Sequence, residues 1–532
     1  MTTFLSTTIP YVNARPHLGF ALELVQGDVL ARHGRQAGDQ VRYQTGTDDN
    51  SLKNVLAAEA EGISPATLVG RNAAAFAGLR EPLALSFDDF IRTSSDPRHR
   101  PGVERLWRAC AARGDLYLKH YEGRYCVGCE QFYKPSELAD GRCPEHGTVP
   151  DTVAERNWFF RLSRYAGQLH DLISSGRLRI EPAARRNEVL GFIAGGLEDF
   201  SVSRSTARAR GWGIPVPGDP DQVIYVWWDA LGNYITSLGY GTGSPDYQRW
   251  WAGADRRVHL AGKGVLRFHA VYWPAILLSA GEPLPTQIGV HDYLTIGGSK
   301  ISKSGLAAPA GQVAAGVVPA GGAAGETADP VALVERYGTD AVRWWLLREV
   351  PRLGDADFTA ARLVARANED LANDLGNLVS RVVTMVHRYR DGRVPAAAEP
   401  AAGGQYARDR DTLLAVSSAA PRRVAAGLDA FDFRAATGSI WDVVEAANRY
   451  VEQTEPWRLA RGERDGDPAA RERLDEVLAV LVSTCARIGR LLDPFLPGLA
   501  AKVLAACDDS PGRLPPAQPV FPRLELASPA AA

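Results

Sequence analysis

The chain begins with an apolar segment that leads directly into the start of a helix, because residues 4–20 are FLSTTIPYVNARPHLGF. Residues 4–9 are apolar and rich in β-branched side chains, and they end at a proline, so they predict a buried strand. Apolar residues then recur at helical spacing over residues 17–33, and residues 39–47 predict a second strand. Strand, helix and strand at this spacing form a βαβ unit, which predicts an α/β fold with a doubly wound parallel sheet of the Rossmann type.

The rest of the chain falls into two further regions. After about residue 116 the pattern changes to short aromatic and turn-rich pieces, and strand-like runs return at residues 223–227 and 258–261. This order predicts a small domain inserted between two halves of the sheet. After residue 329 nearly every segment has helical spacing, which predicts an α-helical bundle. The expected helices cover residues 330–337, 340–348, 360–389, 408–428, 433–453 and 469–492. The end of the chain, from Ser510, is rich in Pro and Ala and is expected to fray.

The composition is that of a soluble globular protein. With 532 residues, 45% of them hydrophobic and 23% charged, the chain is long enough for three or four units. It has no apolar run of about 18 residues, so no membrane span is expected. Its N-terminus lacks the basic and apolar blocks of a secretory signal, so a cytoplasmic protein is expected. The net charge of -2 argues against a generally basic nucleic-acid surface, but not against local recognition of RNA by shape and stacking.

Two segments have the residue types of phosphate-binding sites. In the first, His17-Leu18-Gly19 starts a helix, where backbone N–H groups attract phosphate and an imidazole can donate to phosphate oxygens. The second, Lys300-Ile301-Ser302-Lys303-Ser304, follows a Gly- and Ser-rich turn and can neutralise a departing pyrophosphate. The chain has seven lysines and 53 arginines, so two lysines this close together stand out. The alternatives are an ordinary βα turn and a solvated surface loop.

Four residues have the spacing of a structural zinc site. Cys126-x2-Cys129 and Cys143-x2-His146 supply four ligands in two knuckles, an arrangement typical of tetrahedral Zn²⁺ in small modules. Because protein side chains fill all four positions, the metal is expected to be structural rather than catalytic. Reduced cysteines without a metal are the alternative.

Together these motifs resemble the signatures of class I aminoacyl-tRNA synthetases, and their surroundings resemble the methionyl-tRNA synthetases. The class signatures are His-x-Gly after the first strand and Lys-x-Ser-Lys-Ser about 280 residues later. Stretches similar to the methionyl family follow in order along nearly the whole chain. They are IPYVN (residues 9–13), GTD (46–48), NEVL (187–190), GIPVP (213–217), VWWDA (226–230) and YGTDAVR (337–343).

The resemblance implies an enzyme that activates methionine with ATP and Mg²⁺ and then transfers it to tRNA(Met). The implied catalytic residues are His17, Gly19, Lys300 and Lys303. The implied ATP-binding residues are His17, Glu23, His291, Lys300, Ser302 and Lys303. The implied amino-acid-binding residues are Ile9, Tyr11, Asp48, Trp227, Ala230, Tyr234 and His269. This last set is chemically reasonable, because a carboxylate pairs with an α-ammonium group and aromatic rings can surround a thioether. Taken singly, each aromatic residue is more often plain core.

In the helical part, the resemblance implies that Asn377, Arg381 and Trp457 read the anticodon. An exposed Trp can stack on an unpaired base, and Asn and Arg can bond to base edges. Ordinary helix packing is the alternative. A monomer is expected, with ATP, an amino acid and an acceptor as its partners.

The resemblance also implies a division of the chain into five regions. Residues 1–115 and 221–300 are expected to form the two halves of the catalytic domain, and residues 116–220 the connective insertion with the zinc knuckle. Residues 301–355 are expected to hold the KISKS loop and a region that contacts the tRNA stem, and residues 356–532 the anticodon-binding bundle.

Four departures from the family pattern leave the substrate and the acceptor open. Phe20 stands where the family has His or Asn, and Asp292 where it usually has Gly. Residues 46–53 are GTDDNSLK where the family usually has GTDEHGxK. Residues 307–328 are nearly all Ala, Gly, Val and Pro and lengthen the junction after the KISKS loop, where a flexible excursion is expected.

Three functions are therefore considered. The first is an ordinary, diverged methionine–tRNA ligase. The second is a paralogue that transfers the activated amino acid to a small-molecule amine or hydroxylamine, similar to the synthetase-like ligases of hydrazine-forming pathways. The third is a catalytically inactive tRNA-binding protein, against which His17, Lys300 and Lys303 argue.

Overall fold

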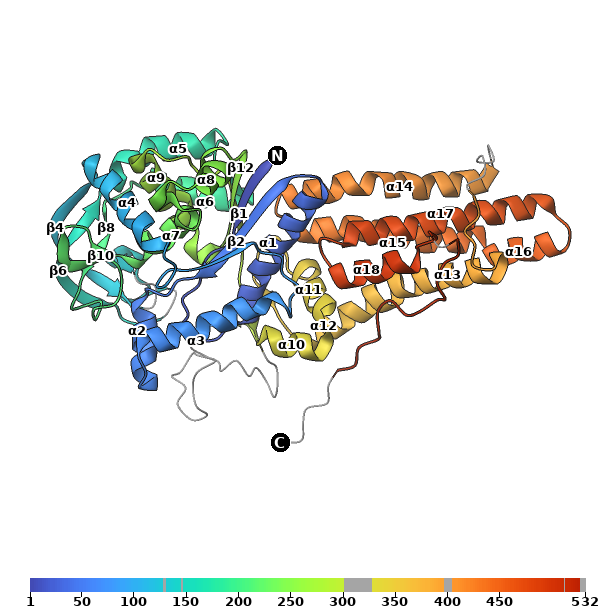
Figure 1. The fold of residues 1–532 in the computed structure, drawn as a ribbon, viewed down its shortest axis with the longest axis horizontal. Helices are drawn as coiled ribbons and strands as arrows, with labels where there is room; N and C mark the ends of the chain where they lie inside the picture. The colour runs from blue at the N-terminus through green and yellow to red at the C-terminus, as the bar shows by residue number, and fades with distance from the viewer. Residues whose placement is uncertain (128–130, 145–146, 301–327, 397–403, 511, 527–532) are drawn as a thin grey trace. The chain divides into compact units, whose positions relative to one another are not determined.

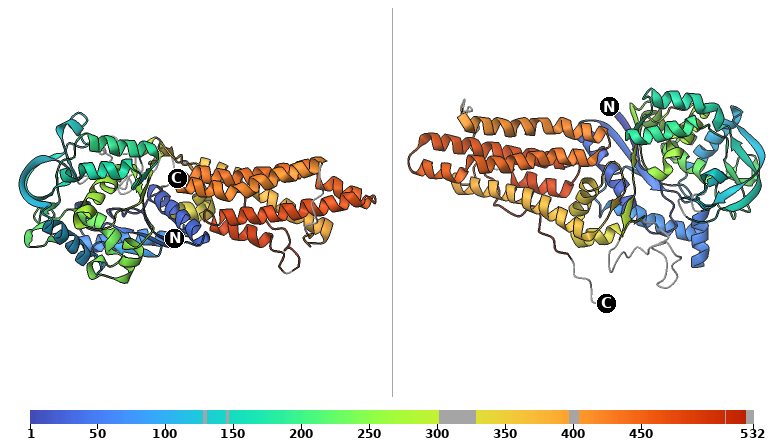
Figure 2. Two further views of the ribbon diagram at one scale, coloured as in Figure 1. Left: turned by 90° about the horizontal axis from the view of Figure 1, so that it is seen from above. Right: turned by 180° about the vertical axis from the view of Figure 1, so that it is seen from behind.

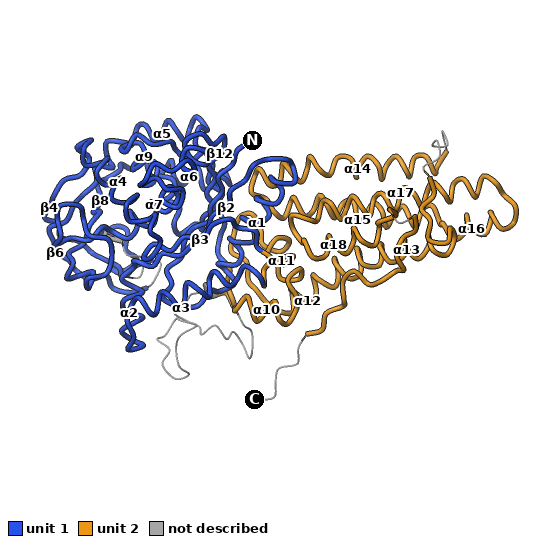
Figure 3. The backbone as a smooth tube through the Cα atoms, viewed as in Figure 1, with its two compact units in different colours: residues 1–81, 85–293, 301–319 blue, residues 82–84, 294–300, 320–532 orange. Residues whose placement is uncertain are grey.

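The chain forms two compact units (Figures 1 and 3). The computed structural model describes residues 1–127, 131–144, 147–300, 328–396, 404–510 and 512–526. The first unit contains residues 1–81 and 85–293, and the second contains residues 82–84, 294–300 and the described residues from 328 onward. Among the described residues, no helix combines the length and the apolar character needed to cross a membrane.

A six-stranded parallel sheet forms the centre of the first unit. Its strands lie in the order β3-β2-β1-β12-β13-β7, and every neighbouring pair is parallel. They are β1 (Thr2–Ser6), β2 (Gln40–Thr47), β3 (Asp89–Arg92), β7 (Arg179–Glu181), β12 (Arg256–Gly262) and β13 (Gln287–His291). The succession of strands runs outward from β1 through β2 to β3 on one side and from β12 to β13 on the other, where β7, from earlier in the chain, adds the edge strand. The predicted doubly wound parallel sheet is therefore confirmed.

Helices connect the strands of this sheet. They are α1 (Leu18–Gln36), α2 (Leu52–Glu61), α3 (Pro65–Ala77), α4 (His99–Ala112), α5 (Ala166–Ser174), α6 (Ala183–Ala194), α7 (Val226–Thr236), α8 (Pro245–Tyr247) and α9 (Trp273–Ala280). The core joins Phe4 of β1 with large aromatic residues of α4, α7 and α9, among them Trp107, Trp228 and Trp273. Each of these tryptophans is at least 97% buried, so the helices that carry them are fixed against the sheet.

Smaller antiparallel sheets occupy part of the region between β3 and β12. One has the order β5-β4-β6-β8 and the other the order β10-β11-β9. Their strands are β4 (Leu116–Cys126), β5 (Gln131–Tyr133), β6 (Asp151–Phe160), β8 (Phe200–Ser201), β9 (Ser203–Ser205), β10 (Pro215–Val216) and β11 (Asp219–Ile224). The segment 116–220 is not entirely separate from the parallel sheet, because β7 pairs with β13 at its edge.

The strand predicted at residues 223–227 is only partly present. Strand β11 ends at Ile224 and pairs with β9 and β10 rather than with the parallel sheet. Tyr225 has φ −60° and ψ 134°, and helix α7 begins at Val226. A run of β-branched and aromatic residues this short does not distinguish a strand from the first turn of a buried helix.

The second unit is mainly helical. It also contains a small sheet of order β15-β14-β16, in which β14 (Leu294–Ile296) and β15 (Ser299–Lys300) precede the helices and β16 (Ala356–Asp357) lies between the second and the third of them. The helices are α10 (Pro330–Tyr337), α11 (Thr339–Arg348), α12 (Ala360–Arg366), α13 (Asn377–Arg390), α14 (Gly404–Asp429), α15 (Phe433–Thr454), α16 (Pro456–Arg464), α17 (Pro468–Leu492) and α18 (Pro497–Ala506). Helices α13, α14, α15 and α17 run side by side (Figure 2). The predicted helical bundle is confirmed.

Within this unit Arg343 of α11 is completely buried and joins distant segments. Its guanidinium donates to the carbonyl oxygens of Phe495 at 2.7 Å, Pro494 at 3.1 Å and Leu83 at 2.9 Å. A planar five-donor group is suited to holding several carbonyls at once.

The prediction that the chain frays from Ser510 is wrong for residues 512–526. Leu514 and Val520 are buried, and the backbone N–H of Leu514 donates to the carbonyl of Gly392 at 2.8 Å. The Asn368 side chain donates to the carbonyl of Leu524 at 2.8 Å and accepts from its N–H at 2.7 Å. Pro and Ala predict little regular structure, but a few apolar residues are enough to hold an irregular segment against helices.

Candidate functional site

The predicted site residues of the first unit gather at the carboxyl ends of the parallel strands. Tyr11 follows β1, Asp48 follows β2, and His291 is the last residue of β13. The order of the strands reverses between β1 and β12, and ligands of doubly wound sheets bind at such a point.

Helix α1 begins with the predicted His-x-Gly motif. His17 is the N-cap residue, and its Nδ1 accepts a hydrogen bond from the N–H of Gly19 at 3.1 Å. A ring nitrogen that accepts carries no proton, so the imidazole proton lies on Nε2, where it can be donated to an anion. A Cβ at Gly19 would lie 3.0 Å from Cε1 of His17, so the glycine leaves room for the ring.

Phe20, which replaces a polar residue of the family pattern, packs inward. Its ring meets that of Phe76 edge to face, with centroids 4.9 Å apart, and it is only 7% exposed. The substitution therefore adds to the core between α1 and α3.

Glu23 and His291, both predicted to bind ATP, contact each other. One carboxylate oxygen of Glu23 accepts from the N–H and the hydroxyl of Thr8 at 2.5 and 2.6 Å. The other lies 2.8 Å from Nε2 of His291, whose Nδ1 lies 2.9 Å from the carbonyl of Asp292. Burial opposes a charge on this ring, but the hydrogen bond and negative charge of Glu23 outweigh it and raise the pKa of His291. Since both ring nitrogens face acceptors, the imidazolium satisfies both contacts.

Asp292, a residue where the family usually has glycine, forms an ion pair. Its carboxylate contacts the guanidinium of Arg185 in α6, which also holds Glu188 at 2.8 Å. The side chain of Asp292 is 4% exposed, so this ion pair is buried on the Asp292 side.

The adjacent carboxylates Asp48 and Asp49 have different surroundings. Asp48 lies beside Tyr11 in an isolated parallel bridge and is 1% exposed. Asp49 accepts from the hydroxyl groups of Ser94 at 2.6 Å and Thr47 at 2.8 Å, and pairs with Arg92 at 3.2 Å. Burial raises the pKa of Asp49, although these contacts oppose the shift. Asp49 is therefore occupied by contacts around the end of β3.

The two residues that follow also have structural partners. Nδ2 of Asn50 donates to Oδ2 of Asp229 in α7 at 2.7 Å. Ser51 is the N-cap of α2 and accepts from the N–H of Lys53 at 3.0 Å. Serine is a favoured N-cap residue, so the replacement of glycine at this position stabilises the start of the helix.

Aromatic rings of α7 and of the segment before α9 form one wall of the site. The ring of Trp227 stacks on Phe268 with centroids 3.8 Å apart and 6° between the planes. It also meets Tyr11 at 6.3 Å and His269 at 6.5 Å, both edge to face. Ala230 lies on the same face of α7 and is 4% exposed, whereas Ile9 is half-buried.

Tyr234 and His269 form a buried hydrogen-bonded pair. Nδ1 of His269 lies 2.9 Å from the carbonyl of Val265 and must donate to it, so Nε2 accepts from the Tyr234 hydroxyl at 2.7 Å. Burial lowers the pKa of His269 and raises that of Tyr234 well above its usual value, so both groups stay neutral. The ring of Tyr234 also lies 4.2 Å from that of His259.

Not every predicted residue can be located. The backbone of Lys300 lies in β15, opposite Thr295 of β14, while Ser302 and Lys303 lie outside the described residues. The stretch 307–328, expected to be flexible, also lies outside them except for its last residue, Ala328.

Two of the four predicted zinc ligands are described. Cys126 ends β4, and Cys143 lies in a turn where the N–H of Gly147 donates to its carbonyl at 2.8 Å. Both cysteines are 1% exposed and share a small apolar cluster with Tyr133, so the fold brings together one cysteine from each predicted knuckle. Cys129 and His146 lie outside the described residues, and within the described part no group of three or more His, Cys, Asp or Glu side chains could hold a metal.

The three residues predicted to read an anticodon are accessible in the second unit. Asn377 and Arg381 are exposed and one turn apart at the start of α13. Trp457 is the second residue of α16 and is 45% exposed, which is unusual for so large an apolar ring.

Sequence reasoning missed the polar network behind α7. His99 of α4 contacts the carboxylate of Asp229 through Nε2 and lies 2.7 Å from the hydroxyl of Thr236 through Nδ1. Asn233 accepts from the amide of Gln44 in β2 at 2.6 Å. These partners are up to 189 positions apart in the chain, and no motif links them.

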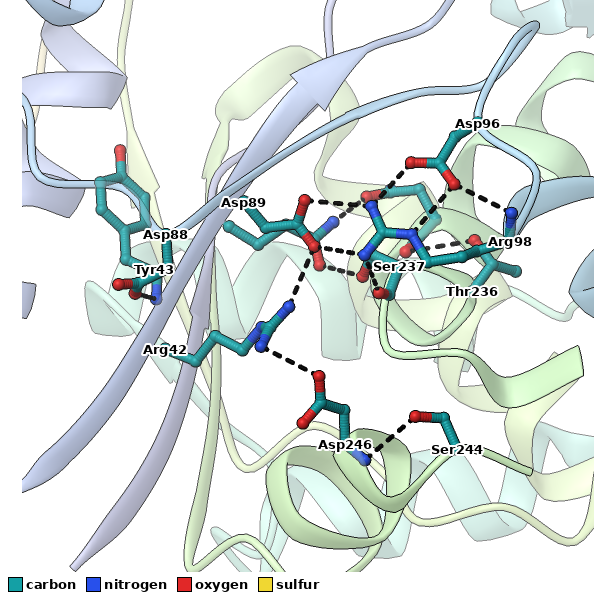
Figure 4. Close-up of polar contacts among 12 residues, drawn as sticks. Arg42, Tyr43, Asp88, Asp89, Asp96, Arg98, Thr236, Ser237, Ser244 and Asp246 are labelled. Carbon is teal, nitrogen blue, oxygen red and sulfur yellow. Dashed lines mark hydrogen bonds and ion pairs between the residues drawn. The ribbon is translucent and has the colours of Figure 1, made fainter. Parts of the chain in front are cut away.

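Ionic contacts extend this network to the edge of the sheet (Figure 4). Arg98 donates to Asp89 at 2.8 Å and to the carbonyl of Ser237 at 2.6 Å. Arg42 of β2 joins the same Asp89 at 3.1 Å to Asp246 of α8 at 3.2 Å. The helix that carries Trp227 and Tyr234 is thus fixed by polar contacts on the side opposite these rings.

Comparison with known proteins identifies related chains. The family model described as "tRNA synthetases class I (M)" matches residues 3–149, 128–312 and 323–383. A protein of Brucella melitensis named methionine–tRNA ligase is 40% identical over 98% of this chain and 97% of its own. One of the same name from Mycobacterium bovis is 39% identical over 99% of this chain and 98% of its own.

Solved structures agree with these relatives. The crystal structure of Mycobacterium tuberculosis methionyl-tRNA synthetase bound by methionyl-adenylate has a TM-score of 0.87 at 38% identity. It covers 98% of this chain and 100% of the other. The apo form of the enzyme from that organism has a TM-score of 0.82 at 36% identity and covers 99% of this chain and 98% of the other.

Proposed function

The chain belongs to the methionyl family of class I tRNA synthetases, and we propose that it activates methionine with ATP and transfers it to tRNA(Met). The observation that carries the proposal is the grouping of Tyr11, Asp48, Trp227, Tyr234 and His269 at the carboxyl ends of the parallel strands. A carboxylate beside a wall of neutral aromatic side chains is complementary to an amino acid with an apolar, polarizable side chain.

In this proposal Asp48 binds the α-ammonium group of methionine. Tyr11, Trp227, Ala230 and His269 surround the thioether, together with Ile9 and Tyr234. Asp49 is held by Ser94, Thr47 and Arg92 around the end of β3, whereas Asp48 lies beside Tyr11 of the aromatic wall, so we assign the ammonium group to Asp48. A neutral Tyr234–His269 pair suits an uncharged side chain, because no buried charge has to be matched.

ATP enters as its Mg²⁺ complex and lies against the start of α1. The methionine carboxylate attacks the α-phosphorus, the bond to the bridging oxygen breaks, and pyrophosphate leaves. His17 donates from Nε2 to the phosphate oxygens, Gly19 allows close approach, and Glu23 with His291 shapes the nucleotide side of the site. Lys300, Ser302 and Lys303 neutralise the leaving group. No covalent intermediate with the protein is required, because positioning and electrostatic stabilisation supply the catalysis.

The aminoacyl group then passes to the terminal adenosine of tRNA(Met), and AMP leaves. Asn377, Arg381 and Trp457 bind the anticodon, where an exposed indole stacks on a base and the two polar groups bond to base edges. We assign residues 1–115 and 221–300 to the catalytic domain and 116–220 to the connective insertion. Residues 301–355 form the lysine loop and stem-contact region, and 356–532 the anticodon-binding bundle. The enzyme acts as a cytoplasmic monomer.

Cys126, Cys129, Cys143 and His146 would hold a structural Zn²⁺ ion in the connective insertion. The buried thiols of Cys126 and Cys143 belong to one cluster, and thiolates at such a position suit zinc. Cys129 and His146 would supply the other two ligands. The ion would replace a hydrophobic core that so small a module lacks.

The departures from the family pattern do not favour a different acceptor. Phe20 adds to the core, Ser51 caps a helix, and Asp292 pairs with Arg185. These three replacements each have a structural partner, so none of them requires a different acceptor.

The experiment that tests this function is aminoacylation of purified tRNA(Met) by the purified chain, followed on acid gels with ATP and methionine. Charged tRNA should accumulate, and omission of ATP or methionine should abolish it. A parallel reaction with hydroxylamine and small amines in place of tRNA measures the alternative acceptor. Enzyme-dependent amide or hydroxamate formation without charging of tRNA would show that the acceptor assignment is wrong.

A further inference from the structure

Asn50 contacts both parts of the proposed amino-acid site. Its backbone N–H donates to Oδ1 of Asp48 at 3.2 Å. Its side-chain Nδ2 donates to Oδ2 of Asp229 at 2.7 Å and lies 3.4 Å from the carbonyl of Thr93. One residue therefore links the carboxylate proposed to bind the α-ammonium group to the helix that carries the aromatic wall.

Helix α7 has two faces with different tasks. Trp227, Ala230 and Tyr234 are three and four positions apart and line the proposed site. Asp229 and Thr236 lie seven positions apart on another face, which contacts α4 through His99. Both sets of residues belong to the same helix, so a shift or rotation of the helix that moves Asp229 and Thr236 also moves Trp227 and Tyr234.

Asp229 is the junction of these contacts. It is 1% exposed, with one oxygen facing Nε2 of His99 and the other facing the amide of Asn50. His99 is fully buried and lies 2.7 Å from the hydroxyl of Thr236, a residue labelled in Figure 4. A buried carboxylate needs donors at both oxygens, so the Asn50 amide holds Asp229, and with it α7, at a fixed distance from Asp48.

We propose that Asn50 and Asp229 form a positioning pair that sets the affinity and selectivity for the amino acid. The proposal rests on the proposed function, because it concerns the same site. Neither residue touches the substrate. Asn50 fixes the distance between the carboxylate proposed to bind the ammonium group and the aromatic wall proposed to bind the thioether. Removing the Asn50 amide therefore weakens amino-acid binding and leaves ATP binding intact.

The test uses substitutions that keep side-chain size and exchange donor for acceptor. Asn50→Asp places an acceptor against the carboxylate of Asp229, and Asp229→Asn removes the charge that Asn50 holds. The double variant restores one donor and one acceptor with reversed polarity. The amide introduced by Asp229→Asn can turn its oxygen toward His99 and its NH₂ toward the carboxylate introduced by Asn50→Asp. Asn448→Asp in α15 is the matched control, since Asn448 also donates from its amide, to the carbonyl of Asp374 at 3.1 Å.

The readout is amino-acid-dependent pyrophosphate exchange, with KM for the amino acid, KM for ATP and kcat measured separately, and a melting curve for each variant. Each single substitution should raise KM for the amino acid about tenfold to a hundredfold, the range of one lost hydrogen bond to a charged group. KM for ATP should remain within about threefold of the original, and the double variant should recover most of the affinity. The control should retain both KM values.

A pH profile adds a signature that a purely structural role would not give. In the Asn50→Asp variant two carboxylates face each other in a buried site, so the pKa of one is raised. Lowering the pH protonates it and restores a donor, so KM for the amino acid should fall toward acid pH in this variant only.

The outcomes separate this inference from the proposed function. An equal rise in KM for the amino acid and KM for ATP with a lowered melting temperature would overturn the positioning role. So would a double variant that recovers no affinity. In either case methionine activation by the unmodified chain would still stand. If no amino acid supports exchange by the unmodified chain, the proposed function and this inference are both wrong.

Discussion

The adjacent carboxylates Asp48 and Asp49 provide a matched pair of substitutions with opposite expected effects. Asp48→Asn keeps an oxygen that can accept from the N–H of Asn50, so the loop should remain in place, but it removes the charge proposed to face the α-ammonium group. A hydrogen bond to a charged group contributes about 1.5–3 kcal/mol, which corresponds to roughly a tenfold to hundredfold increase in KM for methionine. The melting temperature should be nearly unchanged.

Asp49→Asn should act on stability instead. The carboxylate is fully buried and accepts from Ser94 and Thr47 as well as from Arg92. The NH₂ group of the new amide is a donor and faces partners that are also donors. One buried polar group left without an acceptor lowers the free energy of unfolding by about 1–3 kcal/mol. For a unit of this size that lowers the melting temperature by about 2–4 °C for each kcal/mol. KM for methionine should change little.

Both variants are compared with the original chain by pyrophosphate exchange at varied methionine and ATP, and by calorimetry. The reasoning predicts a methionine-specific KM effect for Asp48 and a melting shift for Asp49. If Asp49→Asn raised KM for methionine more than Asp48→Asn did, the assignment of the ammonium-binding carboxylate would be wrong.

Three further substitutions test other parts of the account. Cys126→Ser should lose the zinc measured by elemental analysis and destabilise the insertion, and full retention of metal would refute the knuckle. Lys303→Ala should reduce pyrophosphate exchange strongly while methionine binding, measured by calorimetric titration, is retained; an unchanged exchange rate would remove Lys303 from the mechanism. His291→Gln tests the pair with Glu23. The pKa of His291 is raised in the folded state. The pair therefore stabilises the fold fully below the unfolded-state pKa of about 6.5, and this stabilisation is lost as the pH rises through the higher pKa of the folded state. Urea unfolding should therefore show the largest difference from the original chain at acid pH, and a difference that grows toward alkaline pH would contradict the pairing.

The sequence was sufficient to predict the parts of the fold that depend on local pattern. The segment 39–47 and the helix from residue 17 correspond to β2 and α1, with His17 as the N-cap, and the strand predicted at 4–9 overlaps β1, which begins at Thr2 and ends at Ser6. The boundaries of α10 agree at both ends. Strong helical or strand periodicity with a proline at the boundary accounts for this success.

Elements that depend on tertiary contacts were predicted less well. Trp227 was expected in a strand, but it belongs to α7, whose polar face is fixed by partners far away in the chain. Asp229 contacts His99 from 130 positions away, and no residue pattern near either one indicates that contact. The C-terminal segment holds its place through a few buried residues such as Leu514 rather than through periodicity.

The prediction that Asp48 lies at the end of a strand is confirmed, but the sequence did not distinguish its surroundings from those of Asp49. That distinction depends on Ser94 and Arg92, which reach Asp49 because β3 pairs with β2. The same holds for Phe20: the sequence shows the loss of a polar group, whereas packing against Phe76 shows what replaced it.

The most direct measurement is pyrophosphate exchange by the purified chain with each of the twenty amino acids in turn. If methionine and ATP meet at the carboxyl ends of the parallel strands, methionine alone should support rapid return of labelled pyrophosphate into ATP. Exchange supported best by another amino acid, or by none, would contradict this account.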